Sequence, residues 1–233
     1  MKSEFPLCLI AAPTNEVKDY CQKQWIEQVK NLNYPNYKIF LSDNSMNNSF
    51  SQMIEDNGIE CGRVNPRGKA NPEYMAESHE QVRKKAIEIG AEYLLHWEVD
   101  LFTDNKDIIF DLINAKKSVV GAIYHIEAGE ASHLCIIKSH SHHPAEPVSV
   151  IPLRNGADIE LVDGTVKPVF SCGLGCTLIH RSVFEKIKFR YDINQSFHPD
   201  SSFAEDCYYS KIKIFADTSL LMDHKNQKWL MYN

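Results

Sequence analysis

The sequence predicts an α/β fold with a mostly parallel central sheet, flanking helices and a small β-rich insertion. The first observation behind this prediction is that short apolar runs alternate with helical patterns through the first half of the 233 residues. Such alternation is typical of parallel strands joined by crossover helices. The second is that no internal repeat, low-complexity stretch or linker interrupts the chain. We therefore expect a single domain over residues 1–233.

Four short runs rich in apolar or β-branched residues predict strands in this half, at residues 5–11, 37–41, 93–97 and 118–123. After the first run we predict a helix that is capped by Thr14 or Asn15. Its apolar side repeats every fourth residue, at Val17, Cys21, Trp25 and Val29. This stripe is expected to face the core. The polar side chains expected to face water are Lys18, Lys23 and Glu27.

A second helical pattern covers residues 73–89 and ends at Gly90, as expected where a glycine follows a helix. Its inward side chains are Val82, Ala86, Ile87 and Ile89. Residues 124–167 then change to short β-like pieces separated by Gly, Pro and His. Helical patterns return at residues 181–187 and 203–214, and a last strand is predicted at residues 219–222.

Composition narrows the class of protein. The chain has 25 Lys+Arg and 31 Asp+Glu residues, a formal charge of −6, so a nucleic-acid contact would need a local basic patch. No apolar run approaches the roughly 20 residues that span a bilayer, and residues 5–13 lack the flanks of a secretory signal. Seven scattered cysteines indicate buried thiols in a reducing compartment. We expect a cytoplasmic protein that does not contact a membrane.

Two carboxylates, Glu98 and Asp100, directly follow the apolar run 93–97. If the alternation of the strand continues, both lie on one side, and they repel each other unless a cation or hydrogen-bond donors lie between them. A divalent ion completed by phosphate oxygens is one solution. In the other, Glu98 pairs with a lysine and Asp100 caps a helix that begins near Asn105. The residues alone favour neither.

Further motifs follow in order along the chain. They are Ile-Ala-Ala-Pro-Thr-Asn at 10–15, Leu-Ser-Asp-Asn-Ser at 41–45, Gly-Leu-Gly-Cys-Thr-Leu-Ile-His-Arg at 173–181, Glu-Asp at 205–206 and Asp-His at 223–224. With Glu98-Val99-Asp100 in its place among them, the chain resembles the GT-A glycosyltransferases, in particular the family 2-like enzymes and their viral relatives. The resemblance implies a GT-A (Rossmann-like) domain with a nucleotide-binding half, 1–104, and an acceptor and catalytic half, 105–233.

The resemblance also implies a hexosyl- or pentosyltransferase that moves a sugar from a nucleotide-diphosphate sugar, a UDP-sugar first of all, to an acceptor hydroxyl. Asp100 is expected to bind Mn²⁺ or Mg²⁺ at the diphosphate, and His224 to be a further protein ligand that favours Mn²⁺. Glu98 is expected on the metal's water shell or the donor ribose. Other donor contacts are expected from Pro13, Thr14, Asn15, Asp43, Arg67 and Asn71.

Structural roles are the alternative for several of these residues. Asp43 also fits a plain turn, Arg67 a solvated basic loop and His224 a surface histidine. For the reaction, the resemblance assigns Asp206 of the Glu205-Asp206 pair to take the proton of the acceptor hydroxyl, with inversion at the sugar. The same pair near a helix start also fits a stabilised helix dipole.

The glycines of the 173–181 motif, Gly173 and Gly175, are expected to let the backbone approach the sugar closely. The histidines of the β-like region, at 133, 140, 142 and 143, have no cysteine or acidic residue at ligand spacing, so a polar acceptor loop is favoured over a zinc site. The acceptor classes left open are a glycan, a protein, a small molecule and a hydroxymethylated DNA base.

Two other functions remain as alternatives. A sugar nucleotidyltransferase has overlapping fold and metal needs, but no glycine-rich loop with Arg and Lys follows the first strand. A non-catalytic nucleotide- or carbohydrate-binding module would make the set Glu98, Asp100, Asp206 and His224 a coincidence.

Overall fold

A computed structural model describes residues 4–128, 131–137, 150–152, 162–191 and 198–225. Its centre is an eleven-stranded sheet. The main path of the sheet runs through β3 (Glu60–Arg63), β2 (Tyr37–Asp43), β1 (Cys8–Thr14), β4 (Tyr93–Trp97), β10 (Cys176–His180), β6 (Val119–Ala128), β11 (Ile214–His224) and β5 (Leu101–Phe102).

The first four strands of this path pair in parallel, and β6 pairs with β11 in parallel. β10 lies between β4 and β6 and is antiparallel to both. The predicted α/β class and mostly parallel sheet are confirmed. The carboxyl ends of β1, β2 and β4 meet at one edge, where ligands bind in open α/β sheets.

The β-rich insertion extends from β6. β7 (Ala131–Ile137) pairs with β6 and with β8 (Val150–Pro152), both antiparallel, and β9 (Val166–Val169) pairs with β11. The predicted change to short β-like pieces is confirmed in the described part of this region.

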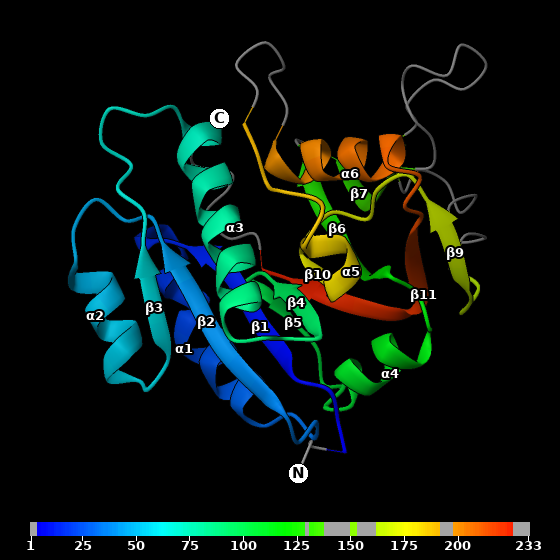
Figure 1. Cartoon of the computed structure of the whole chain (residues 1–233), viewed down its shortest axis with the longest axis horizontal. Helices are drawn as coiled ribbons and strands as arrows, with labels where there is room; N and C mark the ends of the chain where they lie inside the picture. The colour runs from blue at the N-terminus through cyan, green and yellow to red at the C-terminus, as the bar shows by residue number, and fades with distance from the viewer. Residues whose placement is uncertain (1–3, 129–130, 138–149, 153–161, 192–197, 226–233) are drawn as a thin grey trace.

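Helices cover both faces of the sheet because its central strands are buried on both sides. Cys8, Ile10 and Ala12 of β1 pack in one cluster with α1 (Asp19–Lys30), α2 (Ser49–Asp56) and α4 (Ile108–Asn114). Leu9 and Ala11 pack in the other with α3 (Asn71–Glu88), α5 (Arg181–Phe184) and α6 (Pro199–Tyr209). In Figure 1, α3 crosses in front of the sheet and α1 lies behind it. The described helices include none with the length and hydrophobicity that crossing a bilayer requires.

The chain enters α1 through a short 3-10 helix, η1 (Glu16–Lys18), and Asn15 is its cap. The Asn15 side chain accepts a hydrogen bond from the Val17 amide at 3.0 Å. Trp25 and Val29 are fully buried, as the spacing predicts. The prediction that Lys18 faces water is wrong, because its ammonium forms an ion pair with Asp100.

Two predicted boundaries need correction, and two short elements were not predicted. β1 begins and ends three residues later than expected, so Pro13 and Thr14 belong to the strand. The sequence analysis did not identify α2 or β3, both of which are short. α6 begins at Pro199, which suits a first helical position, and is followed by Lys211 with a φ of 58°. Glu205 and Asp206 therefore lie in its second half.

Candidate functional site

A cavity of about 500 Å³ opens at the carboxyl ends of β1 and β4. Its lining comes from the two strand ends, from η1, from the first half of α3 and from the start of α6. The lining residues are Pro13, Thr14, Asn15, Val17, Lys18, Asn44, Asn71, Tyr74, Met75, His79, Glu98, Val99 and His198. Five of the residues predicted to contact a donor are among them: Pro13, Thr14, Asn15, Asn71 and Glu98.

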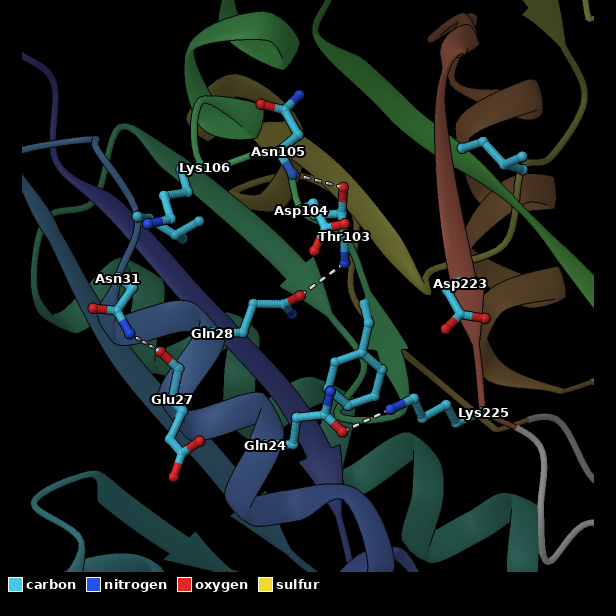
Figure 2. Close-up of a pocket in the computed structure, with 13 residues that line it drawn as sticks. Gln24, Glu27, Gln28, Asn31, Thr103, Asp104, Asn105, Lys106, Asp223 and Lys225 are labelled. Atoms are coloured by element: carbon cyan, nitrogen blue, oxygen red, sulfur yellow. Dashed lines mark hydrogen bonds between the residues drawn. The ribbon is translucent and has the colours of Figure 1, made fainter.

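A second cavity, of about 540 Å³, lies between α1, the loop after β5 and the end of β11 (Figure 2). Its polar side chains bond within its own walls. Gln28 accepts from the Thr103 amide at 2.7 Å, and the Lys225 ammonium reaches Gln24 across the cavity at 2.6 Å. These contacts tie β11 and the loop to α1, so we assign the chemistry to the first cavity.

Asp100 is completely buried behind Lys18, and Lys18 lines the first cavity whereas Asp100 and His224 do not. The ammonium of Lys18, which lines the cavity, pairs with Asp100 Oδ2, and His224 Nε2 lies 3.4 Å from the same oxygen. His224 Nδ1 donates to the His125 carbonyl at 2.8 Å, which turns Nε2 toward the carboxylate. The predicted pair Asp100 and His224 is thus brought together, 124 residues apart in the chain.

The charged groups of this cluster shift the pKa values of one another. Burial alone would raise the pKa of Asp100, but His224 and Lys18 lower it overall. Burial would lower the pKa of His224, and the Asp100 carboxylate raises it overall. For Glu98, burial raises the pKa, and Asp100 adds to the rise against the opposing charge of Lys18. The negative charge is therefore concentrated on Asp100 and is balanced by cations.

The donor set of the cluster fits a divalent ion. Asp100 Oδ1 and His224 Nε2 are buried and have no hydrogen-bond partner among the described residues. A carboxylate oxygen with an imidazole nitrogen suits Mn²⁺. Within the described ranges no three His, Cys, Asp or Glu side chains gather at ligand distance. Oxygen atoms of a ligand and of water would therefore complete the coordination.

Near the carboxyl ends of β1 and β2, three polar side chains form a hydrogen-bonded row. Asn15 donates to Asn44 at 3.2 Å, and Asn44 donates to Ser78 of α3 at 3.1 Å. Asp43, by contrast, is fully buried outside the cavity. Its carboxylate accepts from the Ser45 amide at 2.9 Å and from Arg63 at 2.8 Å. Its oxygens hold the turn that presents Asn44, and the predicted contact of Asp43 with a donor stays a prediction.

Arg67 is exposed and does not line the cavity. Its own amide bonds to Asn65, as in an ordinary polar turn. Asn71, the first residue of α3, does line the cavity. The structure therefore places one of the two residues predicted from this loop at the site.

At Gly173 and Gly175 the backbone comes close to side chains of the protein itself. A Cβ at Gly173 would lie 2.8 Å from Cys135 Sγ, and one at Gly175 would lie 2.4 Å from Leu101 Cδ1 and 2.6 Å from the Tyr124 ring. These glycines therefore leave room for neighbouring side chains of the protein, and their predicted contact with the sugar stays a prediction. The Gly175 carbonyl accepts from the Glu98 amide at 2.7 Å, so the turn holds the backbone of a residue that lines the cavity.

The predicted base does not reach the cavity. Both oxygens of Asp206 bond to the guanidinium of Arg190 at 2.8 Å, and neither Asp206 nor the buried Glu205 lines the cavity. The start of α6 supplies His198 instead. Its Nδ1 lies 2.9 Å from Asp200 Oδ1, and although burial opposes it, this carboxylate raises the pKa of His198 above its ordinary value.

Sequence reasoning missed most of the lining residues that α3 and α6 contribute. His79 follows Ala76 by three residues and precedes Val82 by three, so it belongs to the buried stripe of α3. A histidine in an apolar stripe was the available signal. For His198 the signal was its place before Pro199, since proline favours the first helical position.

Residues 140–143, with three of the histidines predicted to form a polar loop, lie outside the described residues. The cysteines are all free, as the scattered spacing predicts. Five of the seven are buried, and burial raises the pKa of Cys172 to about 11.

Taken together, the strand order, the cavity at the strand ends and the acidic turn after β4 define a GT-A fold. The fold matches the mannosyltransferase PcManGT of Pyrobaculum calidifontis, solved with GDP-Man and Mn²⁺, with a TM-score of 0.63 and 10% identity over 96% of this chain and 58% of that chain. It also matches S. aureus TarS residues 1–349, solved with UDP-GlcNAc, with a TM-score of 0.57 and 9% identity over 98% and 61%.

A third match is a CMP:2-keto-3-deoxy-manno-octonic acid synthetase complexed with CTP, with a TM-score of 0.50 and 8% identity over 93% of this chain and 90% of that chain. The chain spans about three fifths of the length of the two transferases. At these identities the similarity establishes the fold. No protein-family model and no curated protein matches the sequence.

Proposed function

We propose that this protein is a glycosyltransferase that moves a sugar from a nucleotide-diphosphate sugar to an acceptor hydroxyl with the help of a divalent cation. The observation that carries the proposal is the buried pair of Asp100 and His224: Asp100 Oδ1 has no hydrogen-bond partner among the described residues, and His224 Nε2 lies 3.4 Å from the other oxygen of the same carboxylate. The transferases of the same fold that were solved with GDP-Man and Mn²⁺ and with UDP-GlcNAc support the choice of donor and metal.

In this proposal the amide row of Asn15 and Asn44 binds the nucleoside, and Lys18 and Glu98 flank the diphosphate and its ribose. Asp100 and His224 hold Mn²⁺, or Mg²⁺ with weaker binding because imidazole prefers the softer ion. When bound, the ion stabilises the negative charge that develops on the leaving diphosphate. A UDP-sugar is the first donor to test, and a GDP-sugar the second.

The reaction needs a base for the acceptor hydroxyl, and we assign this role to His198. The hydroxyl oxygen bonds to the anomeric carbon as the bond from that carbon to the diphosphate breaks, and the hydroxyl proton passes to His198 Nε2. Asp200 orients the ring, because it accepts from Nδ1 and leaves Nε2 as the basic atom. Attack opposite the leaving group inverts the configuration.

The first test measures binding of nucleoside diphosphates to the protein. UDP and GDP are titrated calorimetrically with and without Mn²⁺, and we expect the metal to tighten binding of one of them. Asp100→Asn and His224→Asn should remove that effect. His180→Asn is the matched control, because His180 pairs with Glu92 outside the cavity. Binding of neither nucleotide by the wild type would refute the proposal.

Turnover is then measured as release of the nucleoside diphosphate against a panel of acceptors. The panel includes a glycan, a serine peptide, a small polyol and hydroxymethylated duplex DNA, since each offers a hydroxyl. His198→Asn should abolish release, and the anomer of the product should be inverted by NMR. Full activity of His198→Asn with loss of activity in Asp206→Asn would reverse the assignment of the base.

A further inference from the structure

Two histidines form a buried pair beneath the cavity, and no step of the proposed reaction uses them. His79 lies on α3 and is 1% exposed, and His96 lies on β4 and is fully buried. His79 Nδ1 is 2.8 Å from His96 Nε2, and the ring planes differ by 20°. The rings are therefore close to parallel, with centroids 4.8 Å apart, and the two nitrogens lie within hydrogen-bond distance.

The backbone fixes which nitrogen of each ring carries the proton. His96 Nδ1 is 2.5 Å from the Leu174 carbonyl, which accepts only, so Nδ1 must carry a proton. A neutral His96 then accepts through Nε2, and His79 must donate from Nδ1. Both rings are neutral, because burial lowers the pKa of His96 to about 4 and lowers that of His79 well below its ordinary value.

These hydrogen bonds also fix the protonation of the other ring nitrogen of His79, Nε2. His79 Nε2 is an unprotonated acceptor, it is buried, and it has no partner among the described residues. His79 lines the cavity, and Phe189 packs against its ring with centroids 5.3 Å apart. A buried acceptor without a donor destabilises the protein, so its partner is expected in a ligand.

The neighbours of His79 narrow the choice of ligand group. Its ring centroid is 6.5 Å from that of His198, the assigned base, and Glu98 lines the same cavity. The row of side chains that is assigned to the nucleoside runs from Asn15 through Asn44 to Ser78, whereas His79 faces His198 with its ring. The sugar under transfer must lie between the diphosphate and the base. Phosphate oxygens offer no proton to an acceptor, whereas sugar hydroxyls do.

We propose that His79 Nε2 accepts a hydrogen bond from a hydroxyl of the donor's sugar and so selects a sugar that carries a hydroxyl at that position. The inference rests on the proposed function, because it requires a nucleotide-sugar in the cavity. His96 and the Leu174 carbonyl are positioning groups, since they set the tautomer of His79 without touching the ligand. An analogue without that hydroxyl leaves a buried acceptor unpaired, and such losses give strong discrimination.

Two substitutions at His79 separate its two nitrogens. His79→Asn keeps an N–H near the Nδ1 position for His96 and removes the acceptor at Nε2. His79→Gln keeps an acceptor near the Nε2 position. We expect His79→Asn to weaken UDP-GlcNAc or GDP-Man binding about tenfold, the value of one well-placed hydrogen bond, and to leave UDP or GDP binding unchanged. His79→Gln should recover most of the loss, and His180→Asn should behave as the wild type.

The wild type supplies a second measurement that does not depend on variant folding. Deoxy analogues of the donor sugar, each lacking one hydroxyl, are titrated in turn, and one of them should bind about tenfold more weakly. In His79→Asn that difference should disappear. If no analogue loses affinity, or if His79→Asn weakens the free nucleoside diphosphate equally, the inference is overturned and the proposed function stands. If the wild type binds no nucleotide, both fall together.

Discussion

Substitution of Gly175 by alanine tests how the glycine turn supports the site. The new Cβ would lie 2.4 Å from Leu101 Cδ1 and 2.6 Å from Tyr124 Cε1, more than about 1 Å inside normal carbon contact. Leu101 is completely buried and Tyr124 is 5% exposed, so a shift of either side chain must displace other buried groups. Overpacking of this kind costs about 1–3 kcal/mol. The melting temperature should fall by about 2–12 °C for a chain of this length.

The assay is chemical denaturation of Gly175→Ala, followed by nucleotide titration at a temperature where the variant is folded. Nucleotide binding should weaken too, because the Gly175 carbonyl holds the Glu98 amide. Gly58→Ala is the control: it has a φ of +73° with open space around it, so it tests backbone strain without crowding. Leu101→Val should offset part of the loss in a double variant. Wild-type stability and binding in Gly175→Ala would refute the packing argument.

Three further predictions follow from the charged groups. Lys18→Met should tighten Mn²⁺ binding about fivefold by calorimetry without nucleotide, because the partly buried ammonium competes for Asp100; weaker binding would contradict this. The pH-rate profile should fall on its acid side through a pKa above 6.5, the ordinary histidine value, because only neutral His198 accepts a proton. Asp200→Asn should move that fall to lower pH. Asp206→Asn should lower the unfolding free energy by about 1 kcal/mol, by denaturation.

The fold was largely predictable because long apolar periodicities are local signals. The stripe Trp25–Val29 and the closing Gly90 fix their helices without knowledge of the rest of the chain. Short elements such as β3 were missed, since four residues carry too little pattern, and the sheet rather than local preference stabilises them. The order of the motifs also brought Asp100 and His224 together correctly.

The errors at the site have a common physical cause. Lys18 was expected in water, but Asp100 is folded against it from 82 residues away, and no spacing within the helix reports that contact. Asp206 was assigned from its motif, although Arg190 occupies both of its oxygens. Residues that are distant in sequence decide whether a carboxylate is already held in an ion pair. Residue type and local spacing therefore predict which carboxylates are candidates for a site, but not whether their oxygens are free to bind a ligand.

The turn at 173–175 contacts two groups at the site, the His96 ring and the Glu98 amide. Two successive carbonyls point at β4: that of Leu174 fixes the tautomer of His96, and that of Gly175 holds the Glu98 amide. A shift of this turn would therefore change the acceptor at His79 and the position of Glu98 together. Because Tyr124 fills the space beside Gly175, the turn has little freedom to shift. The close packing at Gly173 and Gly175 therefore fixes the geometry at the end of β4.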